Sequence, residues 1–149
     1  MEIRPYVIAV GDEVLDDLRD RLARTRWPEK ELVEDWSQGI PLSYVQEMCD
    51  YWAKSYKWRE REAALNKFDH FTSAIDGCEI HYIHQRSPHE DATALLLSHG
   101  WPGSFVEFHK VIGPLTNPTA FGGRAEDAFH VICPSLPGYG LSGNPPTTG

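Results

Sequence analysis

The sequence predicts an α/β fold, in which a helical N-terminal segment is followed by the strands of a sheet. Residues 94–97 form an apolar run that predicts a strand over 95–98, and the run stops in a turn with two glycines and a proline. A helix-like pattern begins at Ser104, a favoured N-cap residue, and is predicted to end near residue 113. Residues 129–133 then form a second strand, parallel to the first and joined to it by a right-handed crossover.

A β-hairpin is predicted just ahead of this unit. Residues 69–75 and 78–84 alternate apolar with polar side chains, and Asp76 and Gly77 between them are a strong signal for a two-residue turn. Three histidines lie on these strands: His70, His81 and His84. We interpret them as surface or core residues rather than metal ligands. Residues three apart on a strand face opposite sides, and no carboxylate or cysteine has a matching spacing.

The N-terminal segment is predicted to be helical after a short β-like arm at residues 5–10. Asp12 is a candidate cap for a first helix, whose arginines lie toward its C-terminal end and complement the helix dipole. Ser43 and Gln46 suggest a capping box for a second helix, and a third helical stretch covers about residues 58–68. No catalytic constellation appears in these helices.

Composition and charge exclude several classes of protein. With 41% apolar and 24% charged residues, the 149-residue chain has the make-up of one ordinary globular domain. Its net charge of −8, without a basic run, argues against binding to nucleic acid or to anionic membranes. Cys49, Cys78 and Cys133 match no metal spacing and are predicted to be free thiols in a reducing compartment. We therefore expect a cytoplasmic protein with no membrane span, no metal and no cofactor.

The turn after the first apolar run is the candidate functional site. Ligands of open α/β sheets bind just beyond the carboxyl ends of strands, and glycines let the backbone pass close to a ligand. Such a loop can aim a main-chain N–H at a developing oxyanion. The candidate site residues are His99, Gly100, Trp101 and Pro102. The alternative is a mere connection between a strand and a helix.

Three stretches resemble the microsomal-type epoxide hydrolases. They are residues 99–104 (His-Gly-Trp-Pro-Gly-Ser), residues 134–142 (Pro-Ser-Leu-Pro-Gly-Tyr-Gly-Leu-Ser) and residues 24–28 (Arg-Thr-Arg-Trp-Pro). The resemblance implies an N-terminal meander at 1–68. It also implies the first four strands of an α/β-hydrolase domain at 69–149, cut short before the nucleophile elbow.

The resemblance also implies a mechanism. An Asp nucleophile opens the epoxide as a covalent ester, two lid tyrosines bind the epoxide oxygen, and water activated by a His–carboxylate pair hydrolyses the ester. Only the oxyanion element carries over to this sequence, as the backbone N–H of Trp101 in the loop from His99 to Pro102. The Gly-Gly-Asp-Trp-type elbow of the family does not occur in residues 1–149. The nucleophile, base and tyrosines are therefore expected beyond Gly149.

Alternatives of different class stay open at this stage. The chain is expected to be the N-terminal portion of an epoxide hydrolase, with a small-molecule epoxide as substrate and a C-terminal segment or second chain as partner. The alternatives are a non-catalytic interaction fragment and another α/β-hydrolase activity, such as ester hydrolysis. We also expect an oligomer, because the strand at 95–98 would have an open edge beside the absent nucleophile strand.

Overall fold

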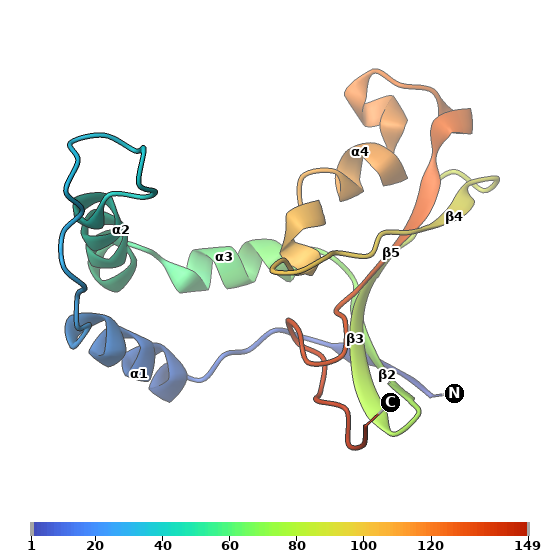
Figure 1. The fold of residues 1–149 in the computed structure, drawn as a ribbon. Helices are drawn as coiled ribbons and strands as arrows, with labels where there is room; N and C mark the ends of the chain where they lie inside the picture. The colour runs from blue at the N-terminus through green and yellow to red at the C-terminus, as the bar shows by residue number, and fades with distance from the viewer. Residues whose placement is uncertain (1, 149) are drawn as a thin grey trace. The chain divides into compact units, whose positions relative to one another are not determined.

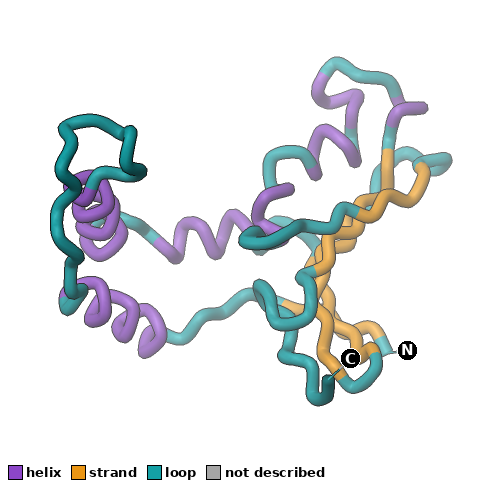
Figure 2. Tube along the Cα trace, in the orientation of Figure 1, coloured by secondary structure: helices purple, strands orange, loops and turns teal. Residues whose placement is uncertain are grey.

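The computed structural model describes residues 2–148, which divide into two compact units. The helical unit is Ala9–Arg61, and the sheet unit combines the chain up to Ile8 with the chain from Glu62 onward. The two units are connected twice, since the chain leaves the sheet unit after Ile8 and returns to it at Glu62 (Figures 1 and 2). The predicted division into segments 1–68 and 69–149 stays a prediction.

The helical unit contains α1 (Asp12–Ala23) and α2 (Leu42–Lys54), which pack against each other, and the start of α3 (Trp58–Leu65). The third helix is thus three residues shorter than predicted. None of residues 9–61 is buried. No helix within residues 2–148 has the length and apolar character needed to cross a bilayer.

Both N-caps predicted for the helical unit are wrong, whereas Ser104 is the N-cap predicted for the sheet unit. The N-cap of α1 is Gly11, and Asp12 is the first helical residue, where its carboxylate still complements the positive end of the helix. The N-cap of α2 is Pro41, so the Ser43–Gln46 box does not form. Instead the distant Glu31 caps α2, because its Oε2 accepts a hydrogen bond from the Leu42 N–H at 2.9 Å.

The sheet unit is built on five strands in the order β1-β2-β3-β5-β4. They are β1 (Ile3–Tyr6), β2 (His70–Ile75), β3 (Cys78–Gln85), β4 (Thr93–Leu96) and β5 (Phe129–Pro134). Only β4 and β5 are parallel, which confirms the predicted parallel pair. The N-terminal arm is a strand at residues 3–6, which begins two residues and ends four residues earlier than predicted, and it pairs antiparallel with β2. The α/β class is confirmed, with the arm as a fifth strand beside the four predicted ones.

The predicted hairpin between β2 and β3 is confirmed with its turn. Asp76 and Gly77 have φ values of 49° and 78°, and Ile75 pairs with Cys78 across the turn. Two central residues with positive φ define the type I′ turn that Asp-Gly favours.

The single helix predicted from Ser104 is wrong in its length and type. The chain forms a 3₁₀ turn, η1 (Phe105–Phe108), and then α4 (Ile112–Thr116). Between them Val111 N–H bonds the Phe108 carbonyl, three residues back, at 2.9 Å, and the four-residue spacing of an α-helix resumes only at Leu115. Two further 3₁₀ turns, η2 (Pro118–Phe121) and η3 (Ala125–Asp127), lead into β5.

The core of the sheet unit lies around β3, β5 and the η1–α4 segment. Its fully buried apolar side chains are Ile83, Ile112, Val131 and Cys133. Buried polar side chains lie among them, including Ser73, His81 and Ser135, each 0% exposed. All three cysteines are free, as predicted, and burial raises the pKa of Cys133 to about 12.

Candidate functional site

The predicted site residues lie in the loop that follows β4. β4 ends at Leu96, two residues earlier than predicted, although the Leu97 N–H still bonds the Ile132 carbonyl of β5 at 2.9 Å. The candidate loop is residues 97–103, which follow β4, and a second loop of residues 135–142 follows β5. Because β4 and β5 are parallel, both loops begin at the carboxyl ends of these strands, on the same side of the sheet.

His99 joins these two loops. Its side chain is buried, and its Nε2 accepts a hydrogen bond from the Leu136 N–H at 3.2 Å. Since Nε2 accepts, the ring proton is on Nδ1, which lies 3.1 Å from the Gly100 carbonyl and donates to it. The ring also makes an edge contact with Tyr139 at 5.5 Å between centroids. His99 therefore anchors the candidate loop and has no free nitrogen for proton transfer.

The next residues form a tight turn with an open backbone donor. The Gly103 N–H bonds the Gly100 carbonyl at 2.8 Å, and the Trp101–Pro102 peptide is cis. Within residues 2–148 the Trp101 N–H has no hydrogen-bond partner. The turn borders a hollow of about 280 Å³. Trp101 is 83% exposed, so the part of the chain that the structure describes leaves its side chain largely uncovered.

Glu107 completes the site and was missed by the sequence analysis. Its Oε1 accepts from the Ser104 N–H at 3.2 Å, while the Ser104 hydroxyl accepts from the Val106 N–H, and together they form a capping box. A Cβ on Gly103 would lie 1.3 Å from Glu107 Oε1, so this position requires glycine while the box is intact. The Ser-x-x-Glu spacing at 104–107 was the signal that could have revealed it.

The loop after β5 is also shaped by glycines. Gly138 and Gly140 have φ values of 79° and 54°. A Cβ on Gly140 would lie 2.7 Å from the Ser135 hydroxyl, so the loop folds tightly over that side chain.

Beneath this loop, two of the strand histidines form a buried chain with Ser135. His70 Nδ1 lies 2.9 Å from His81 Nε2, and His81 Nδ1 lies 2.9 Å from the Ser135 hydroxyl. Burial lowers the pKa of His70, and burial together with the nearby His70 lowers the pKa of His81 to about 4. Both are core residues, as interpreted from the sequence, whereas His84 is only half-buried. Residues 2–148 contain no cluster of three or more His, Cys, Asp or Glu side chains suited to a metal.

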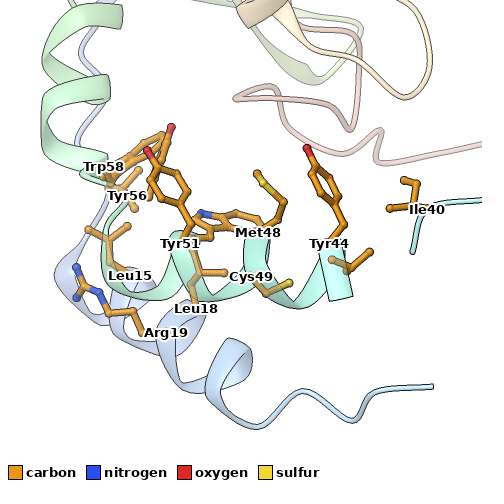
Figure 3. A pocket seen from close by; sticks show the side chains of 13 residues that line it. Leu15, Leu18, Arg19, Ile40, Tyr44, Met48, Cys49, Tyr51, Tyr56 and Trp58 are labelled. Atoms are coloured by element: carbon orange, nitrogen blue, oxygen red, sulfur yellow. The ribbon is translucent and has the colours of Figure 1, made fainter. Parts of the chain in front are cut away.

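The helical unit has an apolar cavity of its own, of about 710 Å³. Its lining comes from α1, α2 and residues near the start of α3, and Figure 3 shows it with Leu15, Leu18, Tyr44, Met48, Tyr51 and Trp58 among the lining side chains. No histidine or carboxylate is among the lining residues. The cavity therefore offers a mostly apolar surface, to which Arg19, Cys49 and three tyrosines add polar groups.

Comparison with known proteins assigns the chain to a family. The family model "Epoxide hydrolase N terminus" matches residues 3–108. A Stigmatella aurantiaca protein, provisionally named as an epoxide hydrolase, is 56% identical over 99% of this chain, which covers 33% of that protein. Epoxide hydrolase 1 of Sus scrofa is 39% identical over 94% of this chain and 32% of its own length. The chain thus spans about a third of the length of these curated relatives.

Solved structures agree with the sequence relatives. The Aspergillus niger epoxide hydrolase aligns with 100% of this chain and 39% of its own, at a TM-score of 0.85 and 35% identity. The juvenile hormone epoxide hydrolase of the silkworm Bombyx mori aligns with 99% of this chain and 35% of its own, at a TM-score of 0.88 and 32% identity. The chain belongs to the epoxide hydrolase N terminus family, and its fold is the N-terminal part of the α/β-hydrolase fold of epoxide hydrolases.

Proposed function

We propose that this chain is the N-terminal part of an epoxide hydrolase and supplies one donor of its oxyanion hole. The observation that carries the proposal is the Trp101 N–H. It has no hydrogen-bond partner within residues 2–148, lies beyond the carboxyl end of β4, and borders the small hollow beside the candidate loop. Membership of the family supports the choice of reaction.

The proposed reaction has two covalent steps. A carboxylate attacks one carbon of the epoxide, the carbon–oxygen bond breaks, and the alkoxide takes a proton, which leaves a hydroxyalkyl ester. Water then attacks the ester carbonyl and gives a proton to a base, while the carbonyl electron pair moves onto the carbonyl oxygen. Collapse of this oxyanion breaks the bond between the carbonyl carbon and the alkyl oxygen, and that oxygen takes the proton from the base, which completes the diol. The carboxylic acid left behind loses its proton, which replaces the one given to the epoxide oxygen in the first step, and the carboxylate is regenerated. The Trp101 N–H acts in the second step, where it stabilises the oxyanion.

The neighbouring residues hold this donor in place. His99 ties the candidate loop to Leu136, and the Gly103–Gly100 hydrogen bond closes the turn that carries Trp101. A donor that is already oriented needs no reorganisation when charge develops, which is why a fixed backbone N–H is effective. The carboxylate nucleophile, the base and the groups that bind the epoxide oxygen would come from a further polypeptide segment, either covalently joined or added as a second chain.

The test is to supply that segment. We define the chimera as this chain followed by the part of the Stigmatella aurantiaca relative that comes after the aligned stretch. The chimera should hydrolyse styrene oxide and form a covalent ester that mass spectrometry detects after rapid quenching. The 149-residue chain alone should show no turnover. Turnover by the pure chain alone, surviving substitution of His99, would refute the assignment, and so would a folded chimera without activity.

A further inference from the structure

The buried chain of hydrogen bonds through His70, His81 and Ser135, beneath the 135–142 loop, runs in a fixed direction from donor to acceptor. The Leu65 carbonyl lies 2.8 Å from His70 Nε2, and because a carbonyl only accepts, His70 Nε2 must donate. A neutral imidazole carries one ring proton, so His70 Nδ1 accepts from His81 Nε2. His81 Nδ1 then has no proton and accepts from the Ser135 hydroxyl. The Leu65 carbonyl at one end therefore determines the position of every proton in this chain of hydrogen bonds.

Ser135 is held by all of its polar groups. Its N–H donates to the His81 carbonyl at 2.8 Å, and its own carbonyl accepts from the Ser142 hydroxyl at 2.8 Å. The Ser142 hydroxyl in turn accepts from the His81 N–H at 2.9 Å. The next residue along the chain is Leu136, whose N–H holds the His99 ring. The single peptide unit between Ser135 and Leu136 therefore connects the buried hydrogen bonds to His99, which anchors the candidate loop.

Packing leaves this arrangement little freedom. Phe105, the first residue of η1, makes edge contacts with His70 and His81, with ring centroids 5.9 Å and 4.9 Å away. Gly140 closes over the Ser135 hydroxyl from the other side, at a distance that excludes any side chain. His81 and Ser135 are each 0% exposed. A shift of Ser135 must therefore be transmitted to its neighbours rather than absorbed by solvent.

We propose that Ser135 and His81 are positioning residues for the candidate loop: the Ser135–His81 hydrogen bond fixes the Leu136 N–H, which fixes the His99 ring and so the direction of the Trp101 N–H. This inference rests on the proposed oxyanion role of Trp101. Neither residue touches the reacting atoms. Their effect is exerted through the backbone at Leu136, and it should appear in ester hydrolysis rather than in formation of the ester.

The first test compares two buried serines in the chimera. Ser135→Ala should slow ester hydrolysis about tenfold or more, so that the covalent ester accumulates, while the rate of ester formation changes little. Loss of an oxyanion donor slows such steps by about 10²–10³-fold, which sets the upper end of the effect. Ser73→Ala is the matched control, because Ser73 is also 0% exposed and its hydroxyl is hydrogen-bonded to the Tyr82 hydroxyl at 3.1 Å, whereas no hydrogen bond within residues 2–148 joins that hydroxyl to the 135–142 loop. It should lower the melting temperature without ester accumulation.

The second test separates the two hydrogen bonds of His81. In His81→Asn the amide oxygen stands near the place of Nδ1 and can still accept from Ser135, but the donor to His70 is lost. In His81→Gln the amide nitrogen stands near the place of Nε2 and can still donate to His70, but the acceptor for Ser135 is lost. Both variants should melt at lower temperature, yet His81→Gln should accumulate several-fold more ester than His81→Asn.

The outcomes distinguish this inference from the proposed function. An inactive wild-type chimera that is folded overturns the proposed function itself. An active chimera in which folded Ser135→Ala hydrolyses the ester as fast as Ser73→Ala overturns the positioning role alone. If Ser135→Ala does not fold, equal ester accumulation in His81→Asn and His81→Gln overturns it instead.

Discussion

Trp101 contributes to the candidate site through its backbone, so its side chain and its N–H can be tested separately. Trp101→Phe keeps the N–H and much of the bulk, and in the chimera it should slow ester hydrolysis only modestly. Gly103→Ala should slow it further, with an upper bound of about 10²–10³-fold, since the added methyl group would lie 1.3 Å from Glu107 Oε1 and either that carboxylate or the turn must move. Rapid-quench kinetics with mass spectrometry measures both effects.

A second substitution tests the cause of the Gly103 effect. In Gly103→Ala combined with Glu107→Ala the carboxylate is gone, and the nearest remaining atom is the Gly100 carbonyl oxygen, 3.2 Å from the new Cβ. The double variant should recover part of the lost rate. If single and double variants are equally slow, the collision with Glu107 is not the cause. Normal ester hydrolysis in folded Gly103→Ala would contradict the oxyanion role of this loop.

The depressed pKa of His81 makes stability depend on pH. The unfolded chain binds a proton at the ordinary pKa of 6.5, whereas the folded chain binds it only near pH 4. Above pH 6.5 His81 is neutral in both states, and the free energy of unfolding does not depend on its titration. As the pH falls from 6.5 toward 4, only the unfolded state binds the proton, so the free energy of unfolding falls by about 1.4 kcal/mol for each pH unit. Between pH 7.5 and 5 the melting temperature of the wild-type chimera should fall more than that of His81→Gln. Parallel curves would show that His81 does not remain neutral in the folded protein.

At the scale of elements, the β2–β3 turn offers a clean test of backbone conformation. A Cβ on Gly77 would meet only Pro146 at 3.6 Å, so Gly77→Ala changes little except the strain of φ 78°. We expect a loss of about 1 kcal/mol of stability, measured by the melting temperature of the chimera. Gly143→Ala is the control, since φ there is not left-handed and the nearest contact is an ordinary 3.5 Å. An equal effect of both substitutions would rule out the turn conformation as the cause.

The elements show how far the sequence alone could reach. Asp76 and Gly77 predict their turn because its determinants are adjacent in the chain. The cap of α2 could not be predicted in this way, because Glu31 lies eleven residues before Leu42 and is brought there by the fold. The apolar pattern after Ser104 predicted a continuous helix, but the backbone there first turns with three-residue spacing.

The candidate site was predictable only in part, for the same reason. The motif marked His99, Gly100, Trp101 and Pro102, and the structure places them in one loop at the end of β4. The link from His99 to Leu136 joins residues 37 apart in sequence, and the His81–Ser135 bond joins residues 54 apart. Periodicity and local spacing carry no information on such contacts.

At the scale of the whole molecule, the two edges of the sheet are unequally protected. β1 carries Pro5, which has no backbone N–H, and the charged Arg4, which is paired with Glu79 of β3; a proline and a charge both oppose pairing with another strand. β4 has the sequence Thr-Ala-Leu-Leu, without a charge, and within residues 2–148 it pairs with β5 alone. Leu96 at its end is 64% exposed. The open edge is therefore β4.

The 149-residue chain alone should consequently self-associate through β4. Leu96→Lys places a charge on this edge and should increase the monomer fraction in sedimentation velocity. Ile3→Lys is the matched control on the opposite edge, where Ile3 is 58% exposed, and should leave association unchanged. A wild-type chain that sediments as a monomer and melts cooperatively would refute the prediction.

The course of the chain makes the helical unit an insertion between two paired strands. β1 ends at Tyr6 and pairs there with His70, so about sixty residues must form a closed loop before this pairing exists. The β2–β3 hairpin closes over two residues and should form first, with β1 adding late. After folding, Ile8 is clamped by both its N–H and its carbonyl to the Asn66 amide, at 2.9 and 2.8 Å. A proteolytic cut in the exposed segment between α1 and α2 would thus leave a separate N-terminal peptide. Its strand β1 would stay paired with β2 through non-covalent contacts alone.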